Sequence, residues 1–190
     1  MTYILALRSD PRRFNFNNPE TPTMKNRFLI AVFCSLLSLS VQADGVLNAY
    51  QTISIKAPIG KVWDAVKDFD GLHKWHPVFS NDVLKSGTNN VVGAIRTLTV
   101  KDGPSFDETL LEWSAAKRRF SYNVIDPNPL PIKNYQSTME VIQAGPGVTA
   151  ILWRSAFENN SGGKMKDEEV INFLNGAYKA GLDPLKISLE

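Results

Sequence analysis

Short runs in which apolar and polar residues alternate follow one another along most of the chain, and this pattern predicts half-buried β-strands. The first run is Tyr50–Lys56 (YQTISIK). Six further runs, separated by short turn-like segments, lie at 78–85, 93–100, 106–113, 118–125, 134–143 and 148–157. Consecutive strands with short connections pair as antiparallel neighbours, so we expect one antiparallel sheet of about seven strands.

Helical periodicity occurs in three places. The stretch from Pro58 to Lys67 predicts a short helix, because proline suits the first helical position and the apolar residues at 59, 62, 63 and 66 share one face. A second helical turn is expected across 72–76. The longest helix is expected at Asp167–Leu185, where the acidic first turn suits the positive end of the helix dipole.

The predicted C-terminal helix has an apolar stripe that contains glycine. Gly176 and Gly181 lie along it, although glycine costs about 1 kcal/mol against alanine inside a helix. The missing side chains either allow close packing or leave a space, and we expect a space, namely a pocket between this helix and the sheet. The stripe consists of Val170, Phe173, Leu174, Ala177, Gly181 and Leu182.

The order of these elements is a strand, two short helices, six strands and a long helix. It predicts an α+β fold rather than an α/β fold. One face of the sheet must be covered, and the terminal helix is the only large amphipathic element available. We therefore expect a curved antiparallel sheet wrapped around one long C-terminal helix.

Residues 24–43 have the pattern of a targeting segment. Lys25 and Arg27 precede an apolar run of 14 residues, Phe28–Val41, which leads to Ala43. This is the order of a secretory signal peptide, and the run is shorter than the roughly 20 residues that a membrane-spanning helix needs. We expect export, cleavage near Ala43, a periplasmic or secreted product and no stable membrane insertion.

Three regions follow from this pattern: residues 1–23, a signal peptide at 24–43, and one domain of 147 residues at 44–190. Residues 1–23 are expected to reflect a start codon assigned too early, with a genuine extension that delays export as the alternative. The only cysteine, Cys34, lies in the apolar run, so the domain needs no disulfide. Residues 44–190 carry 16 basic and 17 acidic residues, so nucleic acid is not expected as a partner.

Several motifs of the domain resemble one family. The matching stretches are ISIKAPIGKVWDAVKDFDGLHKWHP, GAIRTLTV, FDETLLEW, FSYNVID, LPIKNYQSTMEV, ILWRSAF and NGAYKAGLDPLK. They cover nearly the whole domain and are similar to the SRPBCC superfamily (START-like, helix-grip fold), specifically its polyketide cyclase/dehydrase-type branch. Together with the export signal, the domain is also similar to the periplasmic MxaD-type proteins associated with methanol oxidation in some bacteria.

The resemblance implies a deep, mainly apolar cavity between the sheet and the last helix. Members bind lipids, hormones, polyketides or other apolar molecules there, and a minority catalyse cyclisation or dehydration. Pro184 departs from the family pattern, because the terminal helix usually continues at that point. The far end of the helix is therefore expected to be kinked or short.

Two charged residues inside the strand alternation are candidates for the site. Arg96 and Glu108 lie on strands that form a hairpin, so a cross-strand pair is expected. In a pocket, the guanidinium could hold a ligand carboxylate or hydroxyl, and a desolvated Glu108 with a raised pKa could act as a general acid or base. A buried structural ion pair and a solvated pair on the convex face are the alternatives.

The segment Trp75-His76-Pro77 lies where the related proteins place a mouth of the cavity. His76 is a candidate acid/base or hydrogen-bond donor at this entrance, and Trp75 is a candidate wall. Packing of the loop and of the core is the alternative for both. His73 and His76 without a third nearby ligand do not indicate a metal site.

Aromatic residues on three consecutive strands could line the cavity, since each offers apolar area and one polar group. Simple packing in the core of the sheet is the alternative. These residues are Tyr122, Tyr135 and Trp153. Asn134 could supply a second hydrogen bond to a ligand, and Phe173 and Leu174 of the terminal helix would complete the apolar walls.

The chain has no nucleophile elbow, P-loop, G-x-G-x-x-G or H-E-x-x-H motif, and no cofactor is expected. The leading hypothesis is an exported domain that binds a small apolar or amphipathic molecule. One alternative is a cyclase or dehydratase that uses Glu108 or His76 for proton transfer. The other is an accessory protein of a periplasmic oxidation system that acts by contact with a protein partner.

Overall fold

Seven antiparallel strands form one sheet in the computed structural model, which describes residues 45–190. The predicted signal peptide and the segment before it lie outside the described residues. The strands are β1 (Leu47–Ile55), β2 (Phe79–Ser86), β3 (Ile95–Val100), β4 (Ser105–Ser114), β5 (Arg119–Val124), β6 (Ile132–Gly145) and β7 (Val148–Asn159). The helices are α1 (Ile59–Val66), the 3₁₀ helix η1 (Phe69–Lys74) and α2 (Asp167–Leu189).

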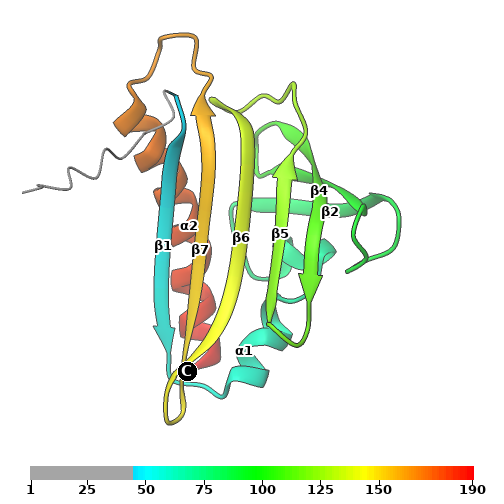
Figure 1. Cartoon of the computed structure of the whole chain (residues 1–190), viewed down its shortest axis with the longest axis vertical. Coiled ribbons are helices and arrows are strands. Elements are labelled where there is room, and N and C mark those ends of the chain that lie inside the picture. Colours follow the sequence, from blue (N-terminus) through cyan, green and yellow to red (C-terminus); the bar gives the residue numbers. More distant parts are fainter. Residues whose placement is uncertain (1–44) are drawn as a thin grey trace, which may run out of the picture. The chain divides into compact units, whose positions relative to one another are not determined.

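The strand order is β1-β7-β6-β5-β4-β3-β2, so the first and last strands of the chain are neighbours and the others pair in sequence. The long helix α2 lies behind β1 and β7 and covers one face of the sheet, called the inner face below (Figure 1). The connection from β1 to β2 carries α1, which contacts β6 and β7, and η1, which contacts β2. The predicted α+β class and the seven-stranded sheet with a C-terminal helix are confirmed.

Each predicted strand is present, with ends shifted by at most three residues. The alternation was reliable because inward residues are buried and outward residues are solvated along most strands. β6 is an example, since Tyr135, Ser137, Met139 and Val141 are buried and the residues between them are less so. The short helical turn begins earlier than expected, at Phe69 instead of residue 72.

The helix α2 continues past Pro184 to Leu189, so the expected shortening is wrong. Proline cannot donate the backbone hydrogen bond that an interior helical position normally supplies. Leu182 and Leu185 are both buried on either side of Pro184, and their packing against the sheet keeps this end of the helix in place.

The two glycines of α2 do not create a pocket. Gly176 is exposed, with open space where a side chain would be. Gly181 is buried against the His76 ring, and a Cβ at this position would overlap the ring. Close packing therefore explains Gly181, and the expectation of a space at these glycines is wrong.

Side chains of Asn175 and Glu190 protect the free edge of β1. The side-chain oxygen of Asn175 accepts a hydrogen bond from the Tyr50 backbone N–H at 2.8 Å, and that of Glu190 accepts one from the Lys56 N–H at 2.8 Å. An unpaired edge strand is a template for pairing with other chains. Side chains of α2 and of its C-cap residue occupy this edge and fix the helix along β1.

The two glycines give a matched pair of stability tests. Gly181→Ala is expected to lower the free energy of unfolding by about 1–3 kcal/mol, because the added methyl displaces the His76 ring in a packed core. Gly176→Ala is expected to raise it by about 0.5–1 kcal/mol, because alanine is the better helix former at an exposed position. Denaturant unfolding of both variants measures these changes, and equal effects of the two substitutions would contradict the packing described for Gly181.

Candidate functional site

The central feature of the inner face is an ion pair between β3 and β4. Arg96 and Glu108 lie directly opposite each other in the antiparallel register. The guanidinium donates from Nε at 2.8 Å and from Nη2 at 2.6 Å, both to Oε2 of Glu108. Only 2% of Arg96 and 4% of Glu108 are exposed. The pair predicted from the hairpin is present in its buried form.

Arg96 also binds groups from η1 and β2. Its Nη1 atom donates to the backbone carbonyl of Phe69 and to Oδ2 of Asp82, the latter at 3.3 Å. The rings of Phe69 and Tyr122 have their centroids 4.3 and 5.4 Å from the guanidinium carbon, so two aromatic faces also hold the cation. Each guanidinium nitrogen has a partner, and Arg96 therefore acts as a positioning residue for Glu108.

One guanidinium thus faces two buried carboxyl groups. Burial raises the pKa of Glu108 and the pKa of Asp82, and the charge of Arg96 offsets part of this effect. Burial alone would lower the pKa of Arg96, but the two carboxylates raise it, so the guanidinium remains charged. With both carboxyl groups ionised the cluster would carry a net negative charge in the core, which favours uptake of a proton by one of them.

A cavity of about 60 Å³ lies beside Glu108 between the sheet and α2. Glu108 is one of its lining residues, and its Oε1 atom accepts no hydrogen bond from residues 45–190. The lining residues are Leu72, His76, Phe79, Leu98, Phe106, Glu108, Tyr122, Tyr135, Trp153, Leu174, Ala177 and Tyr178.

The cavity is smaller than the resemblance implies. It has room for a few water molecules or for a ligand group of a few non-hydrogen atoms, whereas small-molecule pockets usually measure about 300–1,000 Å³. Aromatic rings fill most of the space between sheet and helix. Trp153 and Tyr178, for example, are stacked with their ring centroids 4.4 Å apart.

Hydroxyl groups form a second polar cluster at the wall of this cavity. The Tyr135 hydroxyl is hydrogen-bonded to the Tyr178 hydroxyl at 2.7 Å, and Tyr178 donates to Oγ of Ser155 at 2.7 Å. The indole N–H of Trp153 donates to the Tyr122 hydroxyl at 3.0 Å. The same N–H also reaches Oγ of Ser137 at 3.1 Å, so Trp153, Tyr122 and Ser137 are joined in this cluster.

The tyrosines keep their protons at neutral pH. Burial raises the pKa of Tyr178 to about 12, and it raises the pKa values of Tyr122 and Tyr135 as well. Tyr178 is the polar lining residue that sequence reasoning missed, and the apolar residues Leu72, Phe79, Leu98 and Phe106 were missed as well. The position of Tyr178 four residues from both Leu174 and Leu182 is the signal that could have placed it on the buried stripe of α2.

His76 forms part of the wall beneath α2 rather than an open entrance. It is 1% exposed, and its Nε2–H donates to the backbone carbonyl of Ala177 at 3.0 Å. This hydrogen bond assigns the proton to Nε2, since a carbonyl can only accept. The other ring nitrogen, Nδ1, is buried and has no hydrogen-bond partner within residues 45–190.

Three predicted wall residues lie in different surroundings. Leu174 lines the cavity as expected. Trp75 lies beside a second cavity of about 10 Å³, which Arg96 also lines, and its ring packs 5.9 Å from that of Trp153. Phe173 is 43% exposed, so the prediction that it forms a wall is wrong. The buried stripe of α2 runs through Leu174 and Tyr178, and Phe173 lies to one side of it.

Asn134 does not face the cavity, and its predicted ligand contact is wrong. Its backbone has a φ of 51°, and the register of β6 against β7 shifts between Lys133 and Gln136. This irregularity directs the side chain to the surface, where Nδ2 donates to Glu158 at 2.8 Å. Strand parity read from the sequence fails at such a position.

Within residues 45–190, no group of three or more His, Cys, Asp or Glu side chains is placed to hold a metal ion. None of the helices in this range combines the length and the apolar content needed to cross a membrane.

The family model described as "Polyketide cyclase / dehydrase and lipid transport" matches residues 47–190. This agrees with the resemblance seen in the sequence. No curated protein matches the chain.

Solved structures of similar proteins share the fold. Protein XoxI from Bacillus cereus is 26% identical, with a TM-score of 0.67, and the match covers 75% of this chain and 94% of that one. An uncharacterised protein from Bacillus thuringiensis is also 26% identical, with a TM-score of 0.67 and coverage of 75% and 98%. A protein from Thermobifida fusca is 26% identical, with a TM-score of 0.65 and coverage of 73% and 90%.

The environment of His76 predicts how its charge depends on pH. Burial lowers its pKa from 6.5 to about 4, because an imidazolium at this position would lose its hydration. Between pH 6.5 and 4 the unfolded chain therefore binds more protons at His76 than the folded chain does. The contribution of His76 to stability is complete above this window and falls as the pH falls through it.

We expect this single group to remove about 3 kcal/mol of unfolding free energy between pH 7 and pH 4. Denaturant unfolding at both pH values should show that the loss is smaller by this amount in His76→Gln, in which an amide N–H can still reach the Ala177 carbonyl. An NMR titration of the wild-type imidazole checks the cause, and a midpoint near pH 6.5 would contradict it.

Proposed function

Because the chain belongs to the polyketide cyclase/dehydrase and lipid transport family, we propose that it binds a small amphipathic molecule in the cavity between the sheet and α2. The observation that carries this proposal is the free Oε1 atom of Glu108 at the wall of that cavity. Pairing with Arg96 uses only Oε2. Oε1 can therefore accept a hydrogen bond from a ligand group that donates one.

The polar groups around the cavity determine which hydrogen-bonding groups the polar end of the ligand must have. Glu108 Oε1 can accept a hydrogen bond, and the Tyr122 hydroxyl lies in the wall of the same cavity. A ligand hydroxyl can hydrogen-bond to both groups, since it donates and accepts. The remaining lining is aromatic and aliphatic, which suits an apolar body. A body larger than a few atoms requires α2 or the segment around His76 to move, because both form walls of the cavity.

Binding is favoured over catalysis by the protonation states of the site. At neutral pH His76 is uncharged and the three tyrosines keep their protons. Glu108, whose pKa is raised, is the one carboxyl group among the lining residues. Proton transfer by Glu108 or His76 therefore stays a prediction. It would need a partner group of matched pKa, and no such pair is formed by the lining residues.

The binding proposal is tested by native mass spectrometry of protein purified from its own source, with denaturing extraction of the same sample. We expect a reproducible small molecule to be retained. Glu108→Gln should lower its occupancy about tenfold, because a charge-assisted hydrogen bond to the ligand becomes a neutral one. Asp107→Asn is the matched control, because Asp107 is the preceding residue of β4 and bonds to Lys85 and Thr97 on the other side of the sheet.

The binding proposal fails if extraction yields no small molecule, or if Glu108→Gln retains it as well as Asp107→Asn does. Circular dichroism of both variants separates lost binding from lost folding.

We further propose that residues 24–43 direct export and that the domain acts in the periplasm or outside the cell. The order of basic residues, apolar run and Ala43 supports this proposal. The same mass spectra test it, since the chain recovered from the periplasmic fraction should have the mass of residues 44–190. Recovery of a chain that retains residues 24–43, in the cytoplasmic fraction, would overturn it.

A second candidate function is contact with a partner protein. The observations that favour it are the small volume of the cavity and three exposed apolar side chains on β2 and the loop after it. Val83, Val91 and Val92 are 50%, 54% and 60% exposed. This candidate would replace ligand binding if the purified protein carries no small molecule and a Val91→Ser/Val92→Ser variant loses a cross-linked partner that the wild type forms in cells.

A further inference from the structure

Five lysine and arginine residues lie on the described strands, and four of them form ion pairs. Lys85, Arg96, Arg119 and Lys133 each bind a carboxylate on another strand. Arg154, in the middle of β7, is the exception, because no carboxylate of residues 45–190 forms an ion pair with it. It is exposed on the outer face of the sheet, opposite the face that α2 covers.

A hollow of about 430 Å³ surrounds Arg154 on this outer face. Two cross-strand rows form it. In the first row, Arg154 lies between Tyr50 of β1 and Thr138 of β6. In the second row, Ala156 lies between Asn48 of β1 and Gln136 of β6. The small side chain of Ala156 leaves the floor open between the two rows. The hollow is therefore within the usual size range of ligand pockets, unlike the cavity on the inner face.

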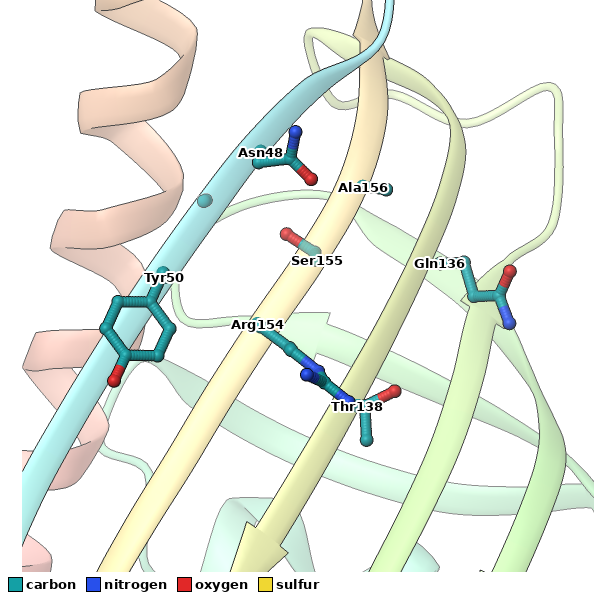
Figure 2. Close-up of a pocket in the computed structure, with 8 residues that line it drawn as sticks. Asn48, Tyr50, Gln136, Thr138, Arg154, Ser155 and Ala156 are labelled. Carbon is teal, nitrogen blue, oxygen red and sulfur yellow. The ribbon is translucent and has the colours of Figure 1, made fainter. Parts of the chain in front are cut away.

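Figure 2 shows the side chains around this hollow. Arg154 extends from β7 over β6 towards Thr138, the Asn48 amide turns towards Ala156, and the Tyr50 ring lies along β1. The side chains of Arg154, Asn48 and Tyr50 make no hydrogen bond to residues 45–190 that would occupy their polar groups. Within the described part of the chain, a fork of guanidinium donors, an amide and an aromatic ring with no side-chain hydrogen bonds therefore line one hollow.

We propose that this hollow is a second binding site, for a small organic carboxylate with a flat apolar body. The guanidinium fork of Arg154 matches the two oxygens of a carboxylate, and pairs of this kind are among the stronger polar contacts in proteins. The Asn48 amide supplies a further donor. The body of the ligand lies over the floor of the hollow beside Ala156, where no large side chain stands. This site uses the outer face alone and does not depend on binding in the cavity at Glu108.

Benzoate is the probe that tests the site, and benzamide is its neutral control of the same shape. Titration of ¹⁵N-labelled protein with benzoate should give saturable NMR shifts at residues 48–50, 136–138 and 154–156. Benzamide and the variant Arg154→Gln should each weaken the affinity about tenfold or more, because each removes the charge-assisted pair. Arg118→Gln, which changes a partly exposed arginine in the turn before β5, should bind as the wild type does.

The proposal is overturned if benzoate gives no saturable shifts at these amides, or if Arg154→Gln and wild type bind it equally. Shifts spread over many exposed lysines and arginines would show a general charge effect and would also overturn it. If Arg154→Gln does not fold, the comparison of benzoate with benzamide on the wild type decides alone.

Discussion

The guanidinium of Arg96 is the one positive charge in the core of the described domain, and the surrounding structure is arranged to keep it there. It takes a carboxylate from β4, a second carboxylate from β2 and a backbone carbonyl from η1, and it lies between two aromatic rings. Removing one partner of such a cluster leaves an uncompensated buried charge, which costs about 3–5 kcal/mol. The ion cluster therefore ties the β2–β4 end of the sheet to the connection that leads to it.

The hydroxyl cluster performs the corresponding task at the other end. Tyr178 joins α2 to β6 and β7 through its hydroxyl and stacks on Trp153, while His76 joins α2 to the segment before β2. The cavity lies where these two clusters meet. Its polar atoms are consequently fixed by the same contacts that hold helix and sheet together. The binding of a ligand there would therefore depend on how α2 packs against the sheet.

The fold was predictable because alternation along the strands records which face is buried, and the Arg96–Glu108 pair was predictable because a hairpin sets its register. The details of α2 were less so. A helical stripe permits more than one choice of neighbours, and Tyr178 was passed over for Phe173, which is exposed. Gly181 has the partner His76 more than 100 residues away, which local pattern cannot show. The predicted ligand contact of Asn134 is wrong because the register shift in β6 has no clear signature in the sequence.

The claim that the buried ion pair organises the site is tested most directly by a double-mutant cycle of Arg96→Met and Glu108→Leu, read as free energies of unfolding. The structure leads us to expect that each single substitution is strongly destabilising, because it leaves the partner charge unpaired in the core. The double variant should recover about 2 kcal/mol or more of the summed loss. Additive effects would mean that the two charges do not depend on each other and that the ion pair does not organise the site.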